Sequence, residues 1–325
     1  MTTYYLGIDV GASNSQVMIA DQSGQLQAFT QGDGANPDWV GNEGMGEVLR
    51  GLLEKALNEA DIDRNQVAGA GFGIAGYDWP SQKSGLIEAI DILDLSAPFD
   101  LVNDAMLALL AGASNDWGIG VVAGTSCNAW GRDKQHRLGR MTGYSWLGEA
   151  SGGVELVDQA QRAVAKEWTR RGPPTSLTQL FQERVGASSV DDLIEGIARR
   201  QYKLQPDDAK LVFQAARDGD LVAHELVLWA GRELGDLALG VVRQLNLANE
   251  QVEIILAGSF WKGSPLLLSA FESVVYPIVP EASIERLKAP PVVGGVCLGM
   301  ELAGMKVDRI KAARERLRKE AQKDP

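Results

Sequence analysis

Residues 4–19 read YYLGIDVGASNSQVMI, which is two apolar runs joined by a short loop of small residues. The first run ends in Asp9, and residues 22–24 (Gln-Ser-Gly) mark a turn into a third apolar run at residues 26–29. Short apolar runs bounded by Gly- and Ser-containing turns are typical of β-strands. The stretch therefore predicts a meander of antiparallel strands, and not a strand that leads into a helix.

The loop that follows Asp9 has the composition of a phosphate-binding loop. Gly11 and Ala12 keep side-chain bulk away from the backbone, so that its N–H groups can approach an anion, and Ser13 adds a hydroxyl donor. Asp9 is placed to hold a hydrated divalent cation. Short loops of this kind are common, so an ordinary hairpin is the alternative. The phosphate contacts predicted here are Gly11, Ala12, Ser13 and Asn14.

The same layout occurs a second time in the chain. Residues 118–133 read GIGVVAGTSCNAWGRD, which is again a strand, a loop of small residues and a strand. Two such units in one chain predict two similar halves that face each other across a cleft. The second set of predicted phosphate contacts is Gly124, Thr125, Ser126 and Asn128.

Length, charge and cysteine content restrict the class of protein. The chain of 325 residues is long enough for two domains of ordinary size. Its net charge of −12 and the lack of a long basic run argue against nucleic acid and an anionic membrane surface as partners. The sequence has no apolar run of membrane-spanning length, and its two cysteines, Cys127 and Cys297, have no metal-ligand spacing. We therefore expect a cytoplasmic protein with reduced thiols.

Three further motifs complete a recognisable set. Residues 34–39 read GANPDW, residues 102–105 read VNDA and residues 254–262 read IILAGSFWK. Together with the two loops of small residues, and in this order, they resemble the sugar kinase/Hsp70/actin ATPase superfamily. Within it the sequence is most similar to N-acetylglucosamine kinase and the related BadF/BadG/BcrA/BcrD ATPase family. The resemblance covers nearly the whole chain.

The resemblance implies a fold and a division into domains. The expected fold class is α/β, a two-lobed actin-like ATPase (ribonuclease H-like) fold with duplicated mixed sheets flanked by helices and a cleft between the lobes. Residues 1–117 would form the lobe with the first phosphate loop, the sugar site and the catalytic acid. Residues 118–298 would hold the second phosphate loop, the adenosine site and a helical insert. Residues 299–325 would form a C-terminal helix that packs back near the hinge.

Asp104 is the candidate catalytic base. It follows a short predicted strand, and ligands of α/β folds bind at the carboxyl ends of strands. The pattern alone fits helix capping equally well, because Asp or Asn before an apolar helix is a common N-cap. The resemblance favours catalysis, since the family's catalytic aspartate occupies an Asp-Ala strand end of this kind. It also implies that Asp9 holds Mg²⁺ and that Gly258 and Ser259 contact the adenosine of ATP.

The resemblance also implies which residues contact the sugar, namely Asn36, Gly76, Asp104 and Glu149. Asn36 by itself reads as a turn residue before Pro37. Its role in sugar binding therefore depends on the resemblance.

Gly76 is the last glycine of a segment that matches the dinucleotide-binding pattern Gly-x-Gly-x-x-Gly, because residues 71–76 read GFGIAG. A Rossmann site needs an uninterrupted buried strand before the first glycine and a helix that starts at the third glycine. Here Gly69 interrupts the preceding strand, and residues 77–80 delay the next helix. We therefore interpret the segment as a strand of small residues whose exit lines the cleft close to the sugar.

Glu149 lies where the chain departs from the family pattern. The relatives usually read Gly-Asp-Glu-Gly-Ser, with an acid that contacts the sugar and helps to organise the metal, whereas residues 148–152 read GEASG. Glu149 can replace the aspartate with a longer reach. The alternative is that Glu149 lies in the first turn of a helix over residues 154–166, where the helix dipole favours an acid. The departure leaves the exact sugar and its N-substituent open.

The activity implied by the resemblance is an ATP- and Mg²⁺-dependent sugar kinase that phosphorylates N-acetylglucosamine at its 6-hydroxyl. Glucosamine is an alternative substrate. A BadF-type ATPase activator of a dehydratase or reductase would need cluster-binding cysteines, which Cys127 and Cys297 do not provide, and Asp104 argues against a non-catalytic sugar sensor. The expected partner is a small-molecule amino sugar. The sequence leaves a homodimer, regulation and the role of the helical insert open.

Overall fold

The computed structural model describes residues 2–322, which form two five-stranded sheets. The strand order is β3-β2-β1-β4-β5 in the first sheet and β10-β9-β6-β7-β8 in the second. The strands are β1 Tyr4–Val10, β2 Asn14–Asp21, β3 Leu26–Asp33, β4 Val67–Ile74, β5 Phe99–Asn103, β6 Gly118–Ala123, β7 Cys127–Arg132, β8 Leu138–Met141, β9 Glu253–Ala257 and β10 Ser283–Arg286.

The two sheets repeat one connectivity. β1, β2 and β3 are antiparallel neighbours, and β4 and β5 continue the sheet in parallel on the other side of β1. β6, β7 and β8 form the same meander, and β9 and β10 continue in parallel beside β6. The meander predicted from the two loops of small residues is therefore confirmed in both halves, and so is the α/β class with duplicated mixed sheets.

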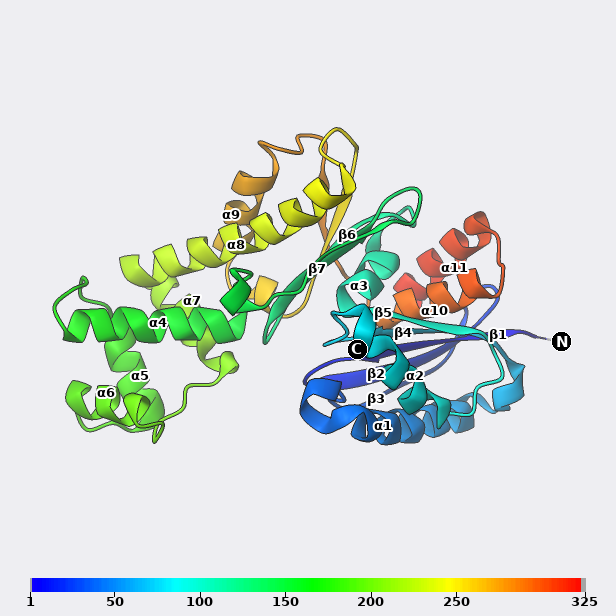
Figure 1. Cartoon of the computed structure of the whole chain (residues 1–325), viewed down its shortest axis with the longest axis horizontal. Helices are drawn as coiled ribbons and strands as arrows, with labels where there is room; N and C mark the ends of the chain where they lie inside the picture. Colours follow the sequence, from blue (N-terminus) through cyan, green and yellow to red (C-terminus); the bar gives the residue numbers. More distant parts are fainter. Residues whose placement is uncertain (1, 323–325) are drawn as a thin grey trace.

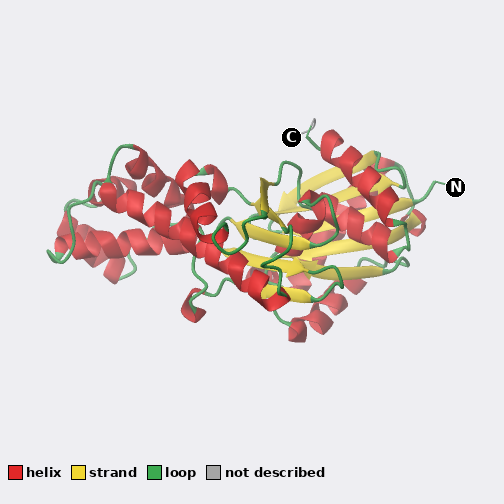
Figure 2. Ribbon diagram, turned by 90° about the horizontal axis from the view of Figure 1, so that it is seen from above, coloured by secondary structure: helices red, strands yellow, loops and turns green. Residues whose placement is uncertain are grey.

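Helices cover the sheets and form a separate group at one end of the molecule. They are α1 Pro37–Ala60, α2 Lys83–Asp91, α3 Asp104–Gly112, α4 Gly153–Trp168, α5 Leu177–Val185, α6 Val190–Ala198, α7 Ala209–Arg217, α8 Leu221–Leu245, α9 Pro265–Val275, α10 Val292–Leu302 and α11 Val307–Glu320. α4 to α7 lie together, far from the first sheet (Figure 1), and Figure 2 shows the same separation from above. None of the helices that the structure describes has both the length and the apolar character needed to cross a membrane.

α1 begins earlier than its apolar pattern predicts. The pattern indicates a helix over residues 44–59, whereas the helix starts at Pro37. Asn36 caps it, because its side chain accepts a hydrogen bond of 2.8 Å from the N–H of Asp38, and proline suits the first helical position. Gly41, with φ of 74°, then interrupts the helical geometry. This kink separates the first turn from the apolar pattern that follows it.

α10 packs on the first sheet through glycines on both sides. A Cβ at Gly71 would lie 2.3 Å from the carbonyl oxygen of Gly295, and a Cβ at Gly69 would lie 2.1 Å from that of Gly299. Residues without a side chain allow helix and strand backbones to approach this closely. Residues near the end of the chain thus cover the first sheet. The lobe boundaries after residues 117 and 298 stay predictions.

α11 packs beside the end of α3. Arg314 is buried, and its guanidinium donates hydrogen bonds of 3.1 Å to the carbonyl oxygens of Leu110 and Ser114. These carbonyls belong to the last turn of α3 and to the segment after it, where helix carbonyls lack intrahelical partners. The C-terminal helix therefore holds the end of α3, whose first residue is Asp104.

Candidate active site

Asp104 is the first residue of α3, where β5 ends. Asn103 is the N-cap, because its side-chain oxygen accepts a hydrogen bond of 2.9 Å from the N–H of Ala105. Asp104 accepts from the same N–H at 3.0 Å through Oδ1. Because Asn103 already caps the helix, capping does not by itself account for the acid at position 104.

Side chains from both halves meet at Asp104. Asn128, on β7 of the second sheet, donates a hydrogen bond of 2.8 Å through Nδ2 to Oδ1 of Asp104. Burial raises the pKa of Asp104, and the hydrogen bonds from Asn128 and from the backbone oppose this effect. Burial, together with the charge of Asp104, raises the pKa of Asp9 on β1 to about 7. The structure thus brings Asp9, Asp104 and Asn128 together from β1, α3 and β7.

The first loop of small residues has a backbone hydrogen bond of its own. The N–H of Gly11 donates to the carbonyl oxygen of Asn14 at 3.0 Å, and the N–H of Ala35 donates to the carbonyl oxygen of Gly11 at 3.1 Å. Gly34 permits this packing, since a Cβ there would lie 2.0 Å from the carbonyl oxygen of Ala12. The segment that carries Asn36 is therefore fixed against the first loop.

The second loop lies between β6 and β7 and receives hydrogen bonds from the start of α4. The N–H of Gly153 donates to the carbonyl oxygen of Gly124, and the N–H of Val154 donates to that of Thr125, both at 2.9 Å. The positive end of the α4 dipole thus lies beside this loop, which favours an anion there. The helix predicted over residues 154–166 is thus confirmed as α4, but its contact with the second loop was not predicted.

The adenosine candidates Gly258 and Ser259 lie beside the second loop. Gly258 follows β9 with φ of 100°, and a Cβ there would lie 2.1 Å from the carbonyl oxygen of Ala123, the last residue of β6. A Cβ on Gly124, in contrast, would meet nothing within 4 Å. The second loop is therefore open at Gly124, whereas Gly258, after β9, is packed against the end of β6.

The sugar candidates divide into two groups. A Cβ on Gly76 would lie 2.9 Å from the side-chain oxygen of Asn36 and 2.8 Å from a carboxylate oxygen of Asp38, so these three residues adjoin. Glu149 lies in another loop, where its carboxylate accepts hydrogen bonds from the N–H of Gly143 (2.7 Å) and from a neighbouring threonine hydroxyl. The helix-dipole alternative for Glu149 is wrong, because α4 does not begin until Gly153.

Sequence reasoning missed Asp78, Asn103 and Tyr144. Asp78 is only 6% exposed, and its carboxylate accepts a hydrogen bond of 3.2 Å from Nδ2 of Asn103. Burial, with the charges of Asp104 and Asp38, raises the pKa of Asp78 to about 7, and hydrogen bonding to Tyr144 opposes this. The sequence carried a signal for a functional role of Asp78, since an acid between two aromatic residues, as in Tyr77-Asp78-Trp79, is unusual for an ordinary turn.

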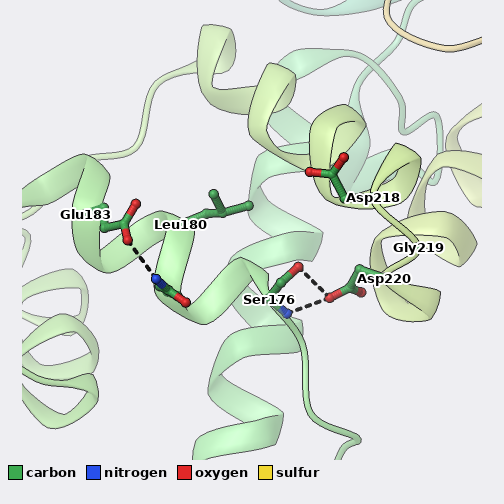
Figure 3. A pocket seen from close by; sticks show the side chains of 7 residues that line it. Ser176, Leu180, Glu183, Asp218, Gly219 and Asp220 are labelled. Carbon is green, nitrogen blue, oxygen red and sulfur yellow. Dashed lines mark hydrogen bonds between the residues drawn. The ribbon is translucent and has the colours of Figure 1, made fainter.

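Two cavities lie in the helical group and away from Asp104. One of about 350 Å³ is lined by Ser176, Leu180, Glu183 and Asp220 among others, and Figure 3 shows Asp220 hydrogen-bonded to Ser176 there. The other, of about 890 Å³, also includes Ser176 and Asp220 in its lining. Their residues do not include any of the predicted phosphate, sugar or metal contacts.

Comparisons with known proteins identify the family of the chain. The sequence model of the BadF/BadG/BcrA/BcrD ATPase family matches residues 6–296. An N-acetylmuramic acid/N-acetylglucosamine kinase of Clostridium acetobutylicum is 27% identical over 300 residues, which are 91% of this chain and 97% of that protein. An N-acetyl-D-glucosamine kinase of Dictyostelium discoideum is 25% identical over 312 residues, with the same coverage of both chains.

A solved structure confirms the fold. A Chromobacterium violaceum protein, described as a candidate N-acetylglucosamine kinase, superposes with a TM-score of 0.65 at 18% identity, covering 97% of this chain and 99% of that one. At this level of identity the likeness concerns the architecture alone.

Proposed function

Because the chain belongs to the BadF/BadG/BcrA/BcrD ATPase family, we propose that it is an ATP-dependent amino-sugar kinase that phosphorylates N-acetylglucosamine at its 6-hydroxyl. The observation that carries the proposal is the position of Asp104, which accepts a hydrogen bond from Asn128 of the other half and whose charge acts on Asp9. The names of the relatives support the same substrate class.

Asp104 is the general base in this mechanism. Its carboxylate accepts the proton of the sugar hydroxyl while that oxygen attacks the γ-phosphorus of ATP, and ADP leaves. Burial favours the role, because a carboxylate whose pKa is raised holds a proton more readily than an ordinary one. The hydrogen bond from Asn128 fixes the direction of one carboxylate oxygen and leaves the other for the sugar.

The two loops would hold the phosphates of ATP. The N–H groups of Gly11 and Gly124 donate within their own loops, to Asn14 and Ser126, so the phosphate donors would be the other groups of residues 11–14 and 124–128. The start of α4 adds the favourable end of a helix dipole. Gly124 lets the nucleotide approach the backbone, and adenosine would lie against Gly258 and Ser259 on the same side. Preorganised donors supply most of the stabilisation in phosphoryl transfer, since it leaves the protein little covalent work.

Mg²⁺ fits the residues around Asp9. Among the described residues no three His, Cys, Asp or Glu side chains gather into a metal cage, but Mg²⁺ in kinases usually takes one or two carboxylates with water and phosphate oxygens. Asp9 and Asp104 are partly buried, and the charge of Asp104 raises the pKa of Asp9, so a cation would offset their repulsion. Asp9 would hold the ion, which supplies charge stabilisation to the transferred phosphoryl group.

The sugar would lie between the two halves, in contact with Asn36, Gly76 and Asp104. Glu149 belongs to the proposed sugar site only if its loop presents the second carboxylate oxygen to the substrate. The first is engaged by backbone and hydroxyl donors. A homodimer and a cytoplasmic location stay predictions.

Glucosamine is the second candidate substrate. The carboxylate of Asp38 faces Gly76 and the Asn36 side chain, where it would attract an ammonium group. The loss of the second acid of the family motif, at Ala150, points to a change in sugar recognition as well.

The iron-dependent activator fits less well. Cys127 and Cys297 are both buried, and burial raises the pKa of Cys297 to about 11 and that of Cys127 further. Buried thiols of high pKa are poor cluster ligands. The two residues also lie on different elements, β7 and α10.

The test is ADP formation with ATP and Mg²⁺ on a panel of N-acetylglucosamine, N-acetylmuramic acid, glucosamine and glucose, with the phosphorylated product identified by ³¹P NMR. The proposal expects ATP consumption that depends on an amino sugar and a 6-phosphate product. ADP release that does not depend on any sugar, or a brown iron-containing protein, would contradict it.

A further inference from the structure

Residues of the two halves touch beside Asp104, on the loop after β4 and the loop after β8. The rings of Trp79 and Tyr144 stack with their centroids 6.3 Å apart and an angle of 20° between their planes. The guanidinium of Arg140 lies 5.2 Å from the centroid of the Trp79 ring and 5.6 Å from that of Trp130. The first half supplies Trp79, and the second supplies the other three residues.

Asp78 links this contact to the start of α3. Its carboxylate accepts from Nδ2 of Asn103, which also donates to the carbonyl oxygen of Tyr77, both at 3.2 Å. The side-chain oxygen of Asn103 accepts a hydrogen bond from the N–H of Ala105 and so caps α3. Asn103 is fully buried, so each of these groups needs its partner.

The ring of Tyr144 reaches this loop from the opposite half, because it stacks on Trp79, the residue after Asp78. The connection therefore runs from Tyr144 to the loop of Asp78 and Trp79, continues from Asp78 to Asn103, and ends one residue before Asp104. Asn128 holds Asp104 directly from the same half as Tyr144.

We propose that Asp78 is a positioning residue: through Asn103 it fixes the start of α3 and so the direction of the Asp104 carboxylate, and the stack of Tyr144 on Trp79 holds the Asp78 loop when the two halves are together. Asp78 would not touch the reacting atoms. It would affect how well the sugar hydroxyl is oriented toward the γ-phosphate of ATP. A change at Asp78 should therefore lower kcat and leave the affinity for ATP unchanged.

The inference rests on the proposed kinase activity, and its test compares substitutions that differ in what they remove. Asp78→Ala deletes the acceptor, Asp78→Asn keeps an acceptor oxygen without the charge, and Tyr144→Ala removes the ring that stacks on Trp79. Asp100→Ala is the control, because Asp100 is an acid on β5 with a half-exposed side chain that pairs with Lys83. Each protein is assayed for kcat, for the KM of ATP and sugar, and for the ratio of ADP formed to sugar phosphate formed.

Asp78→Ala should lower kcat by about tenfold to a hundredfold, the usual effect of losing a partner that orients a functional group, with the KM of ATP within about twofold of wild type. It should also form ADP in excess of sugar phosphate, because water replaces the misdirected hydroxyl. Tyr144→Ala should show the same pattern more weakly, and Asp78→Asn should recover most of the turnover.

Two outcomes would overturn the inference. If Asp78→Ala resembles Asp100→Ala in turnover and in the ADP ratio, Asp78 does not position Asp104. If Asp78→Ala loses turnover and raises the KM of ATP together with a lower unfolding temperature, its role is merely structural. If the wild-type protein phosphorylates no sugar of the panel, both the proposed function and this inference are wrong. If the wild type is active and Asp78→Ala has the same turnover and ADP ratio, only the inference is wrong.

Discussion

The side-chain amide of Asn128, on β7 of the second sheet, donates a hydrogen bond of 2.8 Å to the carboxylate of Asp104, at the start of α3. This is a direct bond between the two halves of the chain at the proposed catalytic residue. Separation of the halves would break it, so the orientation of Asp104 depends on their contact.

Asp104→Asn should bind ATP and sugar normally and lose at least about two orders of magnitude in kcat, since an amide cannot accept the hydroxyl proton. Steady-state kinetics and equilibrium binding of both ligands measure this. Asp308→Asn is the control, because Asp308 is an exposed acid in the first turn of α11. Near-normal turnover of Asp104→Asn would remove Asp104 from the mechanism.

Asn128→Ala should shift the pH dependence of kcat/KM. The Asn128 hydrogen bond lowers the pKa of Asp104 against the raising effect of burial, so its loss should raise that pKa further. A base with a higher pKa becomes protonated at higher pH, so the acid limb of the profile should move to higher pH than in wild type. The measurement is kcat/KM for the sugar from pH 5 to 9, at roughly half-unit steps around the ordinary range of protein bases. An acid limb at the wild-type position would show that Asp104 does not control it.

Gly124→Val should weaken ATP binding without unfolding the protein. A Cβ at Gly124 meets nothing within 4 Å, so the added methyl groups project into the space where the phosphates are proposed to lie. We expect the KM of ATP to rise by about tenfold or more, which corresponds to about 1.4 kcal/mol, with little change in sugar affinity. Gly51→Val is the matched control, since a Cβ there also meets nothing within 4 Å, on the exposed side of α1. Equal ATP affinity in the two variants would move the phosphate site away from this loop.

Asp78→Asn should raise the free energy of unfolding by an amount that depends on pH. The pKa of Asp78 is raised to about 7 in the folded protein, mainly by burial, against an ordinary value of about 4 in the unfolded chain. The folded state therefore holds the proton more tightly, and the stability from the protonated acid is lost as pH rises from about 4 through about 7. The variant, which does not ionise, should gain free energy of unfolding relative to wild type at pH 8 and gain less at pH 5. Urea unfolding at the two pH values measures this, and a difference that is independent of pH would contradict the shift.

Much of the fold could be predicted from local sequence. Both meanders follow from apolar runs with small-residue loops, because strand periodicity and turn chemistry are short-range properties. The strand at residues 99–103 and the helix after it appear as the pattern indicates. The start of α1 was missed because Gly41 breaks the pattern, although Asn36 before Pro37 carried a capping signal.

The network around the site could not be predicted from sequence. Asp78 and Asn103 are 25 residues apart, and Asn128 lies 24 residues from Asp104. Only the folded topology brings these side chains together. The resemblance to a known family directed attention to Asp104, but it could not supply Tyr144, which enters through a stack between the two halves.

The glycine contacts of α10 have a consequence for how the protein is made. β1 and β4 are among the first strands to leave the ribosome, yet the helix that packs on them comes from residues 292–302. Until those residues are synthesised, this face of the first sheet is covered only in part, by α3 at Gly73, and the strand glycines that α10 later covers are exposed to non-native apolar contacts. Nascent chains that stall before α10 should therefore depend on chaperones, and a fragment ending at residue 117 should aggregate unless the C-terminal segment is supplied with it.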